Sequence, residues 1–97
     1  MKVHFTRTLR TSSSERFLIH ADNGKDVAAL DLHYLELQRV VGTLTVLDPG
    51  AIPEAKVAEL LREIDEKLLP DASIEDGKLS FTVVSGHVVG TFQPHPA

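Results

Sequence analysis

The apolar residues change their spacing partway along the 97-residue chain, and this change constrains the fold more than any other feature. Before residue 48 they alternate with polar residues, as in strands that bury one face. Between residues 54 and 69 a helical spacing replaces the alternation, at Val57, Leu60, Leu61, Ile64 and Leu68. Alternation returns after residue 77. This order, βββ(β)–α–ββ, predicts a single α+β domain over residues 1–97. We expect an antiparallel sheet of five to six strands, with one amphipathic helix packed on one face.

Turn residues predict the hairpins of this sheet. Asn23-Gly24 stands between two alternating runs and is a preferred two-residue turn, because both positions tolerate positive φ. The pairs that it predicts are Phe17 with Leu30, Ile19 with Ala28, Arg16 with Asp31 and His20 with Val27. A three-residue loop at 36–38 predicts the pairs Tyr34–Val40, Leu32–Gly42 and Leu30–Leu44. A second two-residue turn, at residues 85–86, predicts the pairs Val83–Val88, Phe81–Gly90 and Leu79–Phe92.

The tetrapeptide Val-Val-Gly-Thr occurs twice, at residues 40–43 and 88–91. In the predicted hairpins each glycine lies on the core face, where Leu32 covers Gly42 and Phe81 covers Gly90. A glycine inside a strand weakens it unless a neighbouring side chain covers the gap. A phosphate-binding loop would instead join a strand to the start of a helix. We therefore expect the repeat to serve the architecture of the sheet.

Composition excludes several classes of protein. The chain has no cysteine, which excludes disulfides, thiolate catalysis and cysteine-based zinc sites. Its net charge of −4 argues against nucleic acid as a partner, because phosphate binding needs a basic surface. Neither a signal peptide nor a run of eighteen apolar residues is visible. We expect a cytoplasmic protein with no membrane contact.

The run of residues 39–47, RVVGTLTVL, resembles the central strand of acyl-CoA acetyltransferases. That superfamily would need a glycine-rich pyrophosphate loop that leads into the following helix. The corresponding residues 47–61 contain a single glycine and neither arginine nor glutamine. We therefore do not assign the chain to that family, and we predict no cofactor.

Two groups of polar residues are candidates for a site on the outer face of the sheet. His4 faces His20 if Phe5 pairs with Ile19, and two such side chains can share a metal ion or respond to pH. The alternative is a pair of surface histidines, since a metal site also needs a third ligand. The second group is a polar patch formed by Arg16, Asp31, His33 and Thr43. Its simplest interpretation is a cross-strand ion pair with a small effect on stability.

The size of the sheet suggests a function. Six strands span about 24 Å, whereas a helix with its side chains is about 10 Å wide. Core-face residues such as Val3, Phe5, Leu79 or Phe92 then need further cover, from coiling of the sheet, a second chain or a ligand. We expect an interaction module that acts through homodimerisation or through a protein partner. The alternative is a small-molecule or metal-binding domain that uses the pocket between helix and sheet or the outer polar face. No nucleophile with a positioned base is apparent, so an enzyme is the less favoured interpretation.

Overall fold

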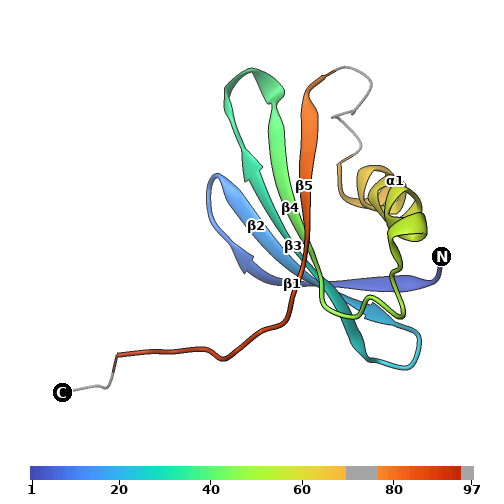
Figure 1. The fold of residues 1–97 in the computed structure, drawn as a ribbon. Helices are drawn as coiled ribbons and strands as arrows, with labels where there is room; N and C mark the ends of the chain where they lie inside the picture. The colour runs from blue at the N-terminus through green and yellow to red at the C-terminus, as the bar shows by residue number, and fades with distance from the viewer. Residues whose placement is uncertain (70–76, 95–97) are drawn as a thin grey trace.

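The computed structural model describes residues 1–69 and 77–94, and it has an α+β fold (Figure 1). Five strands form one sheet in the order β1-β2-β3-β4-β5. Their bounds are β1 Val3–Arg10, β2 Ser14–Ala21, β3 Asp26–Tyr34, β4 Val40–Val46 and β5 Leu79–Ser85. One α-helix, α1 (Val57–Leu68), lies on one face of the sheet, and single 3-10 turns occur at η1 (Glu36–Gln38) and η2 (Glu54–Lys56). The predicted α+β fold with one helix is confirmed. The sheet is mostly antiparallel rather than wholly so, and within the described residues one strand, not two, follows the helix.

Strands β1 to β4 form an antiparallel meander whose register follows the alternation of the sequence. The observed pairs include Phe5–Ile19, His4–His20, Phe17–Leu30, Ile19–Ala28, Arg16–Asp31, Leu32–Gly42 and Tyr34–Val40. Since side chains alternate between the two faces of a sheet, these pairs place the apolar residues on one face. That face is the one that α1 covers (Figure 1).

The turn between β2 and β3 is longer than predicted. The N–H of Ala21 donates to the C=O of Lys25 at 2.9 Å, and Gly24 within this loop has a φ of 84°. A bulge follows, and it places Asp26 opposite His20. The predicted pair of His20 with Val27 is therefore wrong. The physical reason is an extra residue in β3. Val27 has no partner on β2, and its side chain is buried in the core next to that of Ala28.

Strand β5 pairs with β4 in parallel, with α1 in the connection between them. A parallel pair needs such a crossover, and a helix is its usual form. The C=O of Lys78 accepts from the N–H of Val40 at 2.7 Å, and the N–H of Gly86 donates to the C=O of Val46 at 3.0 Å. The N–H and C=O of one strand residue point to the same side, and the side alternates along the strand. The even-numbered residues of β5 therefore direct their backbone groups to β4.

This polarity explains why the hairpin predicted at residues 85–86 is wrong. A two-residue turn there would require Val84 to exchange hydrogen bonds with His87, yet the backbone groups of Val84 face β4. Gly86 also lacks the positive φ of such a turn. Residues 86–94 contain no strand, and they extend away from the sheet (Figure 1).

The core lies between α1 and the concave face of the sheet. Leu60 and Ile64 of the helix are fully buried there. The strands rotate from β5 to β1, so the sheet curls around the helix (Figure 1). This coiling, one of the three covers expected from the sequence, buries Val3 and Leu79 on the two edge strands.

The two copies of Val-Val-Gly-Thr have different environments. Gly42 lies on the core face of β4, where Leu32 covers it as predicted and Phe81 covers it as well. Gly90 lies in the segment beyond the sheet, and its near neighbour is Phe92 of the same segment. The expectation that Phe81 covers Gly90 within one hairpin is wrong, because that hairpin does not form.

Candidate functional site

The predicted polar patch lies on the outer face of the sheet. The Nε atom of Arg16 donates to Oδ1 of Asp31 at 2.7 Å, and both side chains are partly exposed. Thr43 follows on β4 as the partner of Asp31. His33 is exposed two residues further along β3. The structure thus aligns Arg16, Asp31 and Thr43 across three strands, with His33 beside them.

The two candidate metal ligands are also neighbours, since His4 and His20 face each other across β1 and β2. Each ring, however, contacts a different carboxylate. Nε2 of His4 lies 2.7 Å from Oδ1 of Asp22, and Nδ1 of His20 lies 2.9 Å from Oδ1 of Asp26. The other nitrogen of His20 lies 2.6 Å from the hydroxyl oxygen of Thr6. The result is two separate histidine–aspartate pairs.

Within residues 1–69 and 77–94, no group of three histidine or acidic side chains is placed to hold a metal ion. The two aspartates were missed from the sequence for different reasons. Asp26 comes beside His20 through the bulge in β3, which alternation does not reveal. Asp22 stands two residues after His20, and this spacing is the signal that was available.

A third polar group, which the sequence analysis did not single out, lies at the open end of the core face. The hydroxyl of Tyr34 donates to Oε1 of Glu15 at 2.8 Å, and Arg7 lies 3.5 Å from the other carboxylate oxygen. Burial and the hydrogen bond to the nearby carboxylate of Glu15 raise the pKa of Tyr34 to about 12. The available signal was Arg7, which interrupts the apolar face of β1. This group stabilises the strand ends and presents no free nucleophile.

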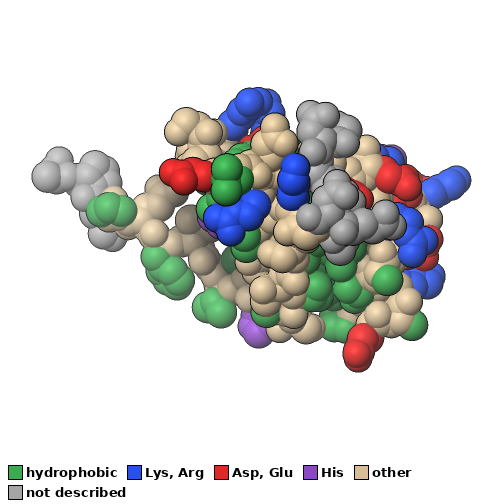
Figure 2. Space-filling model, turned by 90° about the horizontal axis from the view of Figure 1, so that it is seen from above, with side chains coloured by type: hydrophobic (Ala, Val, Ile, Leu, Met, Phe, Trp, Pro, Cys, Tyr) green, Lys and Arg blue, Asp and Glu red, His purple; other side chains and the backbone are tan. Residues whose placement is uncertain are grey.

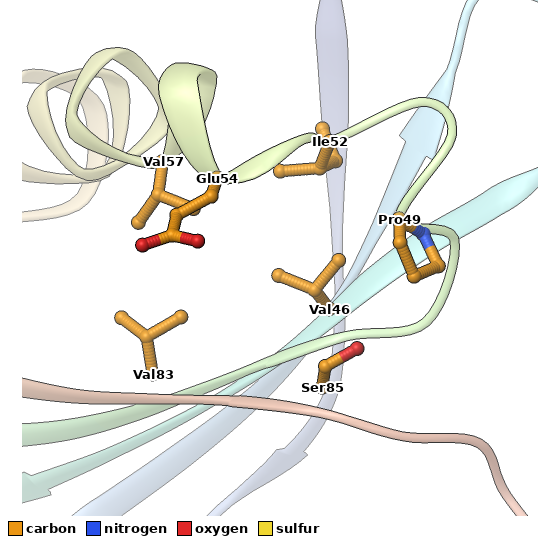
Figure 3. Close-up of a pocket in the computed structure, with 7 residues that line it drawn as sticks. All are labelled: Val46, Pro49, Ile52, Glu54, Val57, Val83 and Ser85. Atoms are coloured by element: carbon orange, nitrogen blue, oxygen red, sulfur yellow. The ribbon is translucent and has the colours of Figure 1, made fainter.

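A pocket lies between the start of α1 and the far ends of β4 and β5 (Figure 3). Its volume is about 410 Å³, and its lining residues are Val46, Pro49, Ile52, Glu54, Val57, Val83 and Ser85. In Figure 3, Glu54 and Val57 face Val83 across the pocket, and Ile52 faces Val46. The walls are mainly apolar, with one carboxylate and one hydroxyl.

Residues 86–94, here called the exposed segment, follow β5 and carry strongly exposed apolar side chains. The exposed fractions are 67% for Val88, 83% for Val89 and 86% for Phe92. Hydrophobic side chains are visible along the part of the chain that leaves the body (Figure 2). This segment is a candidate contact surface, because single apolar residues on a surface are ordinary but a concentration of them is not.

Comparison of the chain with protein-family models, with curated proteins and with solved structures finds no match. Among the helices in the described part of the chain, none is long and apolar enough to cross a membrane. The functional assignment therefore rests on the geometry of the chain itself.

Proposed function

We propose that this chain is a small interaction module that acts through homodimerisation or by binding a protein partner. The observation that carries the proposal is the distribution of exposed apolar side chains. Among the described residues, nine large apolar side chains are exposed, and five of them lie between residues 83 and 92. These five are Val83, Val84, Val88, Val89 and Phe92.

The charge pattern supports the same surface. Charged residues make up 25% of the chain, yet residues 79–94 contain none. The core of a protein–protein interface is depleted in charged residues, because desolvating them is costly. We call residues 79–94 the uncharged stretch; it comprises β5 and the exposed segment.

An energetic comparison indicates how large the contact has to be. Full burial of a valine or phenylalanine side chain contributes about 1.5–3 kcal/mol. Association costs about 4–15 kcal/mol in lost translational and rotational freedom. Val88, Val89 and Phe92 offset only the lower part of that range. The contact therefore has to include further groups of the uncharged stretch, such as the backbone of β5.

Light scattering over a wide range of protein concentration tests the proposal. We expect the wild type to form a dimer and the double variant Val89→Ser/Phe92→Ser to be monomeric at the same concentrations. Leu37→Ser is the matched control, because Leu37 is 82% exposed but lies in the loop between β3 and β4. A wild type that stays monomeric throughout contradicts self-association. Equal weakening by Leu37→Ser contradicts the choice of surface.

A second candidate function is the binding of a small apolar ligand in the pocket of Figure 3. A volume of about 410 Å³ falls within the range typical of ligand sites, about 300–1,000 Å³. The carboxylate of Glu54 in an otherwise apolar wall favours a ligand with a cationic or hydrogen-bond-donating group.

A thermal-shift screen tests this second candidate. A ligand of the pocket raises the melting temperature of the wild type, because it binds only the folded state. Val57→Phe fills the pocket and should remove that shift, whereas Val41→Phe, on the outer face, should retain it. A ligand whose shift survives Val57→Phe binds elsewhere.

A further inference from the structure

We infer that residues 87–92 of one copy pair as a β-strand with the free edge of β5 in a second copy, and that the two copies exchange these strands reciprocally. This inference rests on the proposed function and names its partner as the same chain. Three observations support it: the edge of β5 is unpaired, the backbone of the exposed segment is unpaired, and the side chains of the two fit in one register.

The outer edge of β5 is unpaired within the described residues. One side of β5 pairs with β4, and the sheet ends there. The backbone groups of the even-numbered residues of β5 point to β4. The N–H and C=O groups of the odd-numbered residues therefore point to the free edge of the sheet; these residues are Leu79, Phe81, Val83 and Ser85. Such a row of free backbone groups is a template for another strand.

The two edges of the sheet differ in protection. Native proteins protect an edge strand with charges, prolines or bulges. Strand β1, at the opposite edge, contains Arg7 and Arg10 and a bulge between Arg7 and Leu9. Strand β5 has no charged residue, no proline and an uninterrupted register of seven pairs with β4. The β5 edge is therefore the one left open to strand addition.

The exposed segment has the properties of the missing strand. Its residues 88–92 are valine, valine, glycine, threonine and phenylalanine, of which four favour strands. None of the backbone groups of residues 87–94 bonds to the backbone of another described residue. The segment lies away from the sheet (Figure 1). It offers unpaired backbone groups and apolar side chains to a partner.

Side chains of the two strands match in one antiparallel register. Val83 then lies opposite Val88, Phe81 opposite Gly90 and Leu79 opposite Phe92. Phe81 would have a glycine on each side, Gly42 on β4 and Gly90 on the added strand. This arrangement gives both copies of Val-Val-Gly-Thr the same role, which is to leave room for one aromatic ring.

The backbone favours a second copy over the same chain as the source of this strand. Closure within one chain needs Val84 to bond to His87, and the backbone groups of Val84 face β4. A strand from another copy has no turn to form, so it can bond to the outward groups of Phe81 and Val83. Two identical copies related by a two-fold axis place the strands antiparallel, and both then donate and receive one.

Disulfide trapping tests the exchange, since the wild type has no cysteine. Single variants Val83→Cys and Val88→Cys are refolded together and oxidised. We expect a covalent heterodimer on non-reducing gels, about tenfold more abundant than with the control pair, because directly opposite residues meet the distance limits of a disulfide. The control replaces Val83→Cys by Val84→Cys, whose side chain has similar exposure, 43% against 39%, but lies on the other face of β5.

The alternative outcomes are distinct. A double variant Val83→Cys/Val88→Cys that forms only an intramolecular disulfide overturns the exchange, because each segment then closes on its own strand. If the wild type is dimeric by light scattering but the two cysteine variants give no heterodimer, the exchange is also overturned, while the proposed self-association stands. A monomer without cross-links overturns both.

A variant without cysteine provides a second measurement. Val88→Pro changes a residue outside the sheet of the monomer, so the circular dichroism of the monomer should stay unchanged. In the proposed register the backbone of residue 88 faces Val83, so proline removes a donor that bonds to β5, and this variant should be monomeric where the wild type is dimeric. Val89→Pro is the matched control, because the N–H of residue 89 points away from β5 in that register. A Val88→Pro protein that keeps the wild-type dimer overturns the exchange.

Discussion

The aromatic ring of Phe81 lies over Gly42 on the adjacent strand, and the two residues pair directly across β4 and β5. A Cβ atom added at Gly42 would lie 2.5 Å from two ring carbons of Phe81 and 3.3 Å from a methyl carbon of Leu32. The ring therefore fills the space that a side chain at position 42 would occupy.

This contact predicts different effects at the two glycines of the repeat. Gly42→Ala should lower the free energy of unfolding by about 1–3 kcal/mol, because the ring has to move out of a packed position. Gly90→Ala is the control in the monomer, since its Cβ would lie 3.5 Å from Phe92, an ordinary contact; it should change the stability of the monomer by less than about 0.5 kcal/mol. Urea denaturation at protein concentrations where the chain is monomeric measures both. Equal losses in the monomer would contradict the contact between Phe81 and Gly42.

The helix predicts a second contrast in stability. Leu60 is fully buried between α1 and the sheet, whereas its neighbour Leu61 is half-buried. Leu60→Ala should cost about 2–5 kcal/mol, because it removes buried methyl groups and leaves a cavity. Leu61→Ala is the control in the same helix and should cost clearly less. The order of the two denaturation midpoints checks the observed orientation of α1, and a reversed order would contradict it.

Tyr34 predicts a pH effect with a defined sign. Its pKa is raised to about 12, above the usual 10.0, so folding favours the protonated phenol. The resulting stabilisation is complete below the unfolded pKa and is lost as the pH rises through the folded pKa. The chain has one tyrosine and no tryptophan, so the absorbance of tyrosinate reports this group alone.

The expected titration midpoint of Tyr34 is about 12 in the folded wild type. Glu15→Gln should lower that midpoint, because it removes the negative charge beside the phenol. Glu66→Gln, on the exposed side of α1, should leave it unchanged. A wild-type midpoint at the usual value would show that the contact between Tyr34 and Glu15 does not hold in solution.

The histidines predict the response to zinc. His4 and His20 contact separate aspartates, so the two rings do not converge on one position. Zinc should therefore shift the melting temperature of the wild type and of His20→Ala equally, and His87→Ala provides a control for histidines elsewhere on the surface. Stabilisation of the wild type that His20→Ala abolishes would instead establish a metal site at this pair.

Several parts of the fold and of the candidate site could be predicted from the sequence. The turn at Asn23-Gly24 predicted the pair of Arg16 with Asp31, and His4 faces His20 because Phe5 pairs with Ile19, which is the condition stated from the sequence. Asp26 could not be predicted as the partner of His20. Its position depends on the bulge at Val27, whose C=O accepts the N–H groups of Leu47 and Asp48 from the loop after β4. Bonds between segments so distant in sequence leave no local pattern.

The strand of residues 79–85 separates what the sequence determined from what the tertiary structure decided. Alternation predicts a strand there, with Leu79 and Phe81 on the apolar face, because a strand exposes its residues to two sides in turn. Alternation does not specify the partner, and the next run, at residues 87–92, matched it equally well. A hairpin alone buries little apolar surface and is marginally stable. Pairing with β4 instead buries Leu79, closes one edge of the sheet and lets the ring of Phe81 cover Gly42.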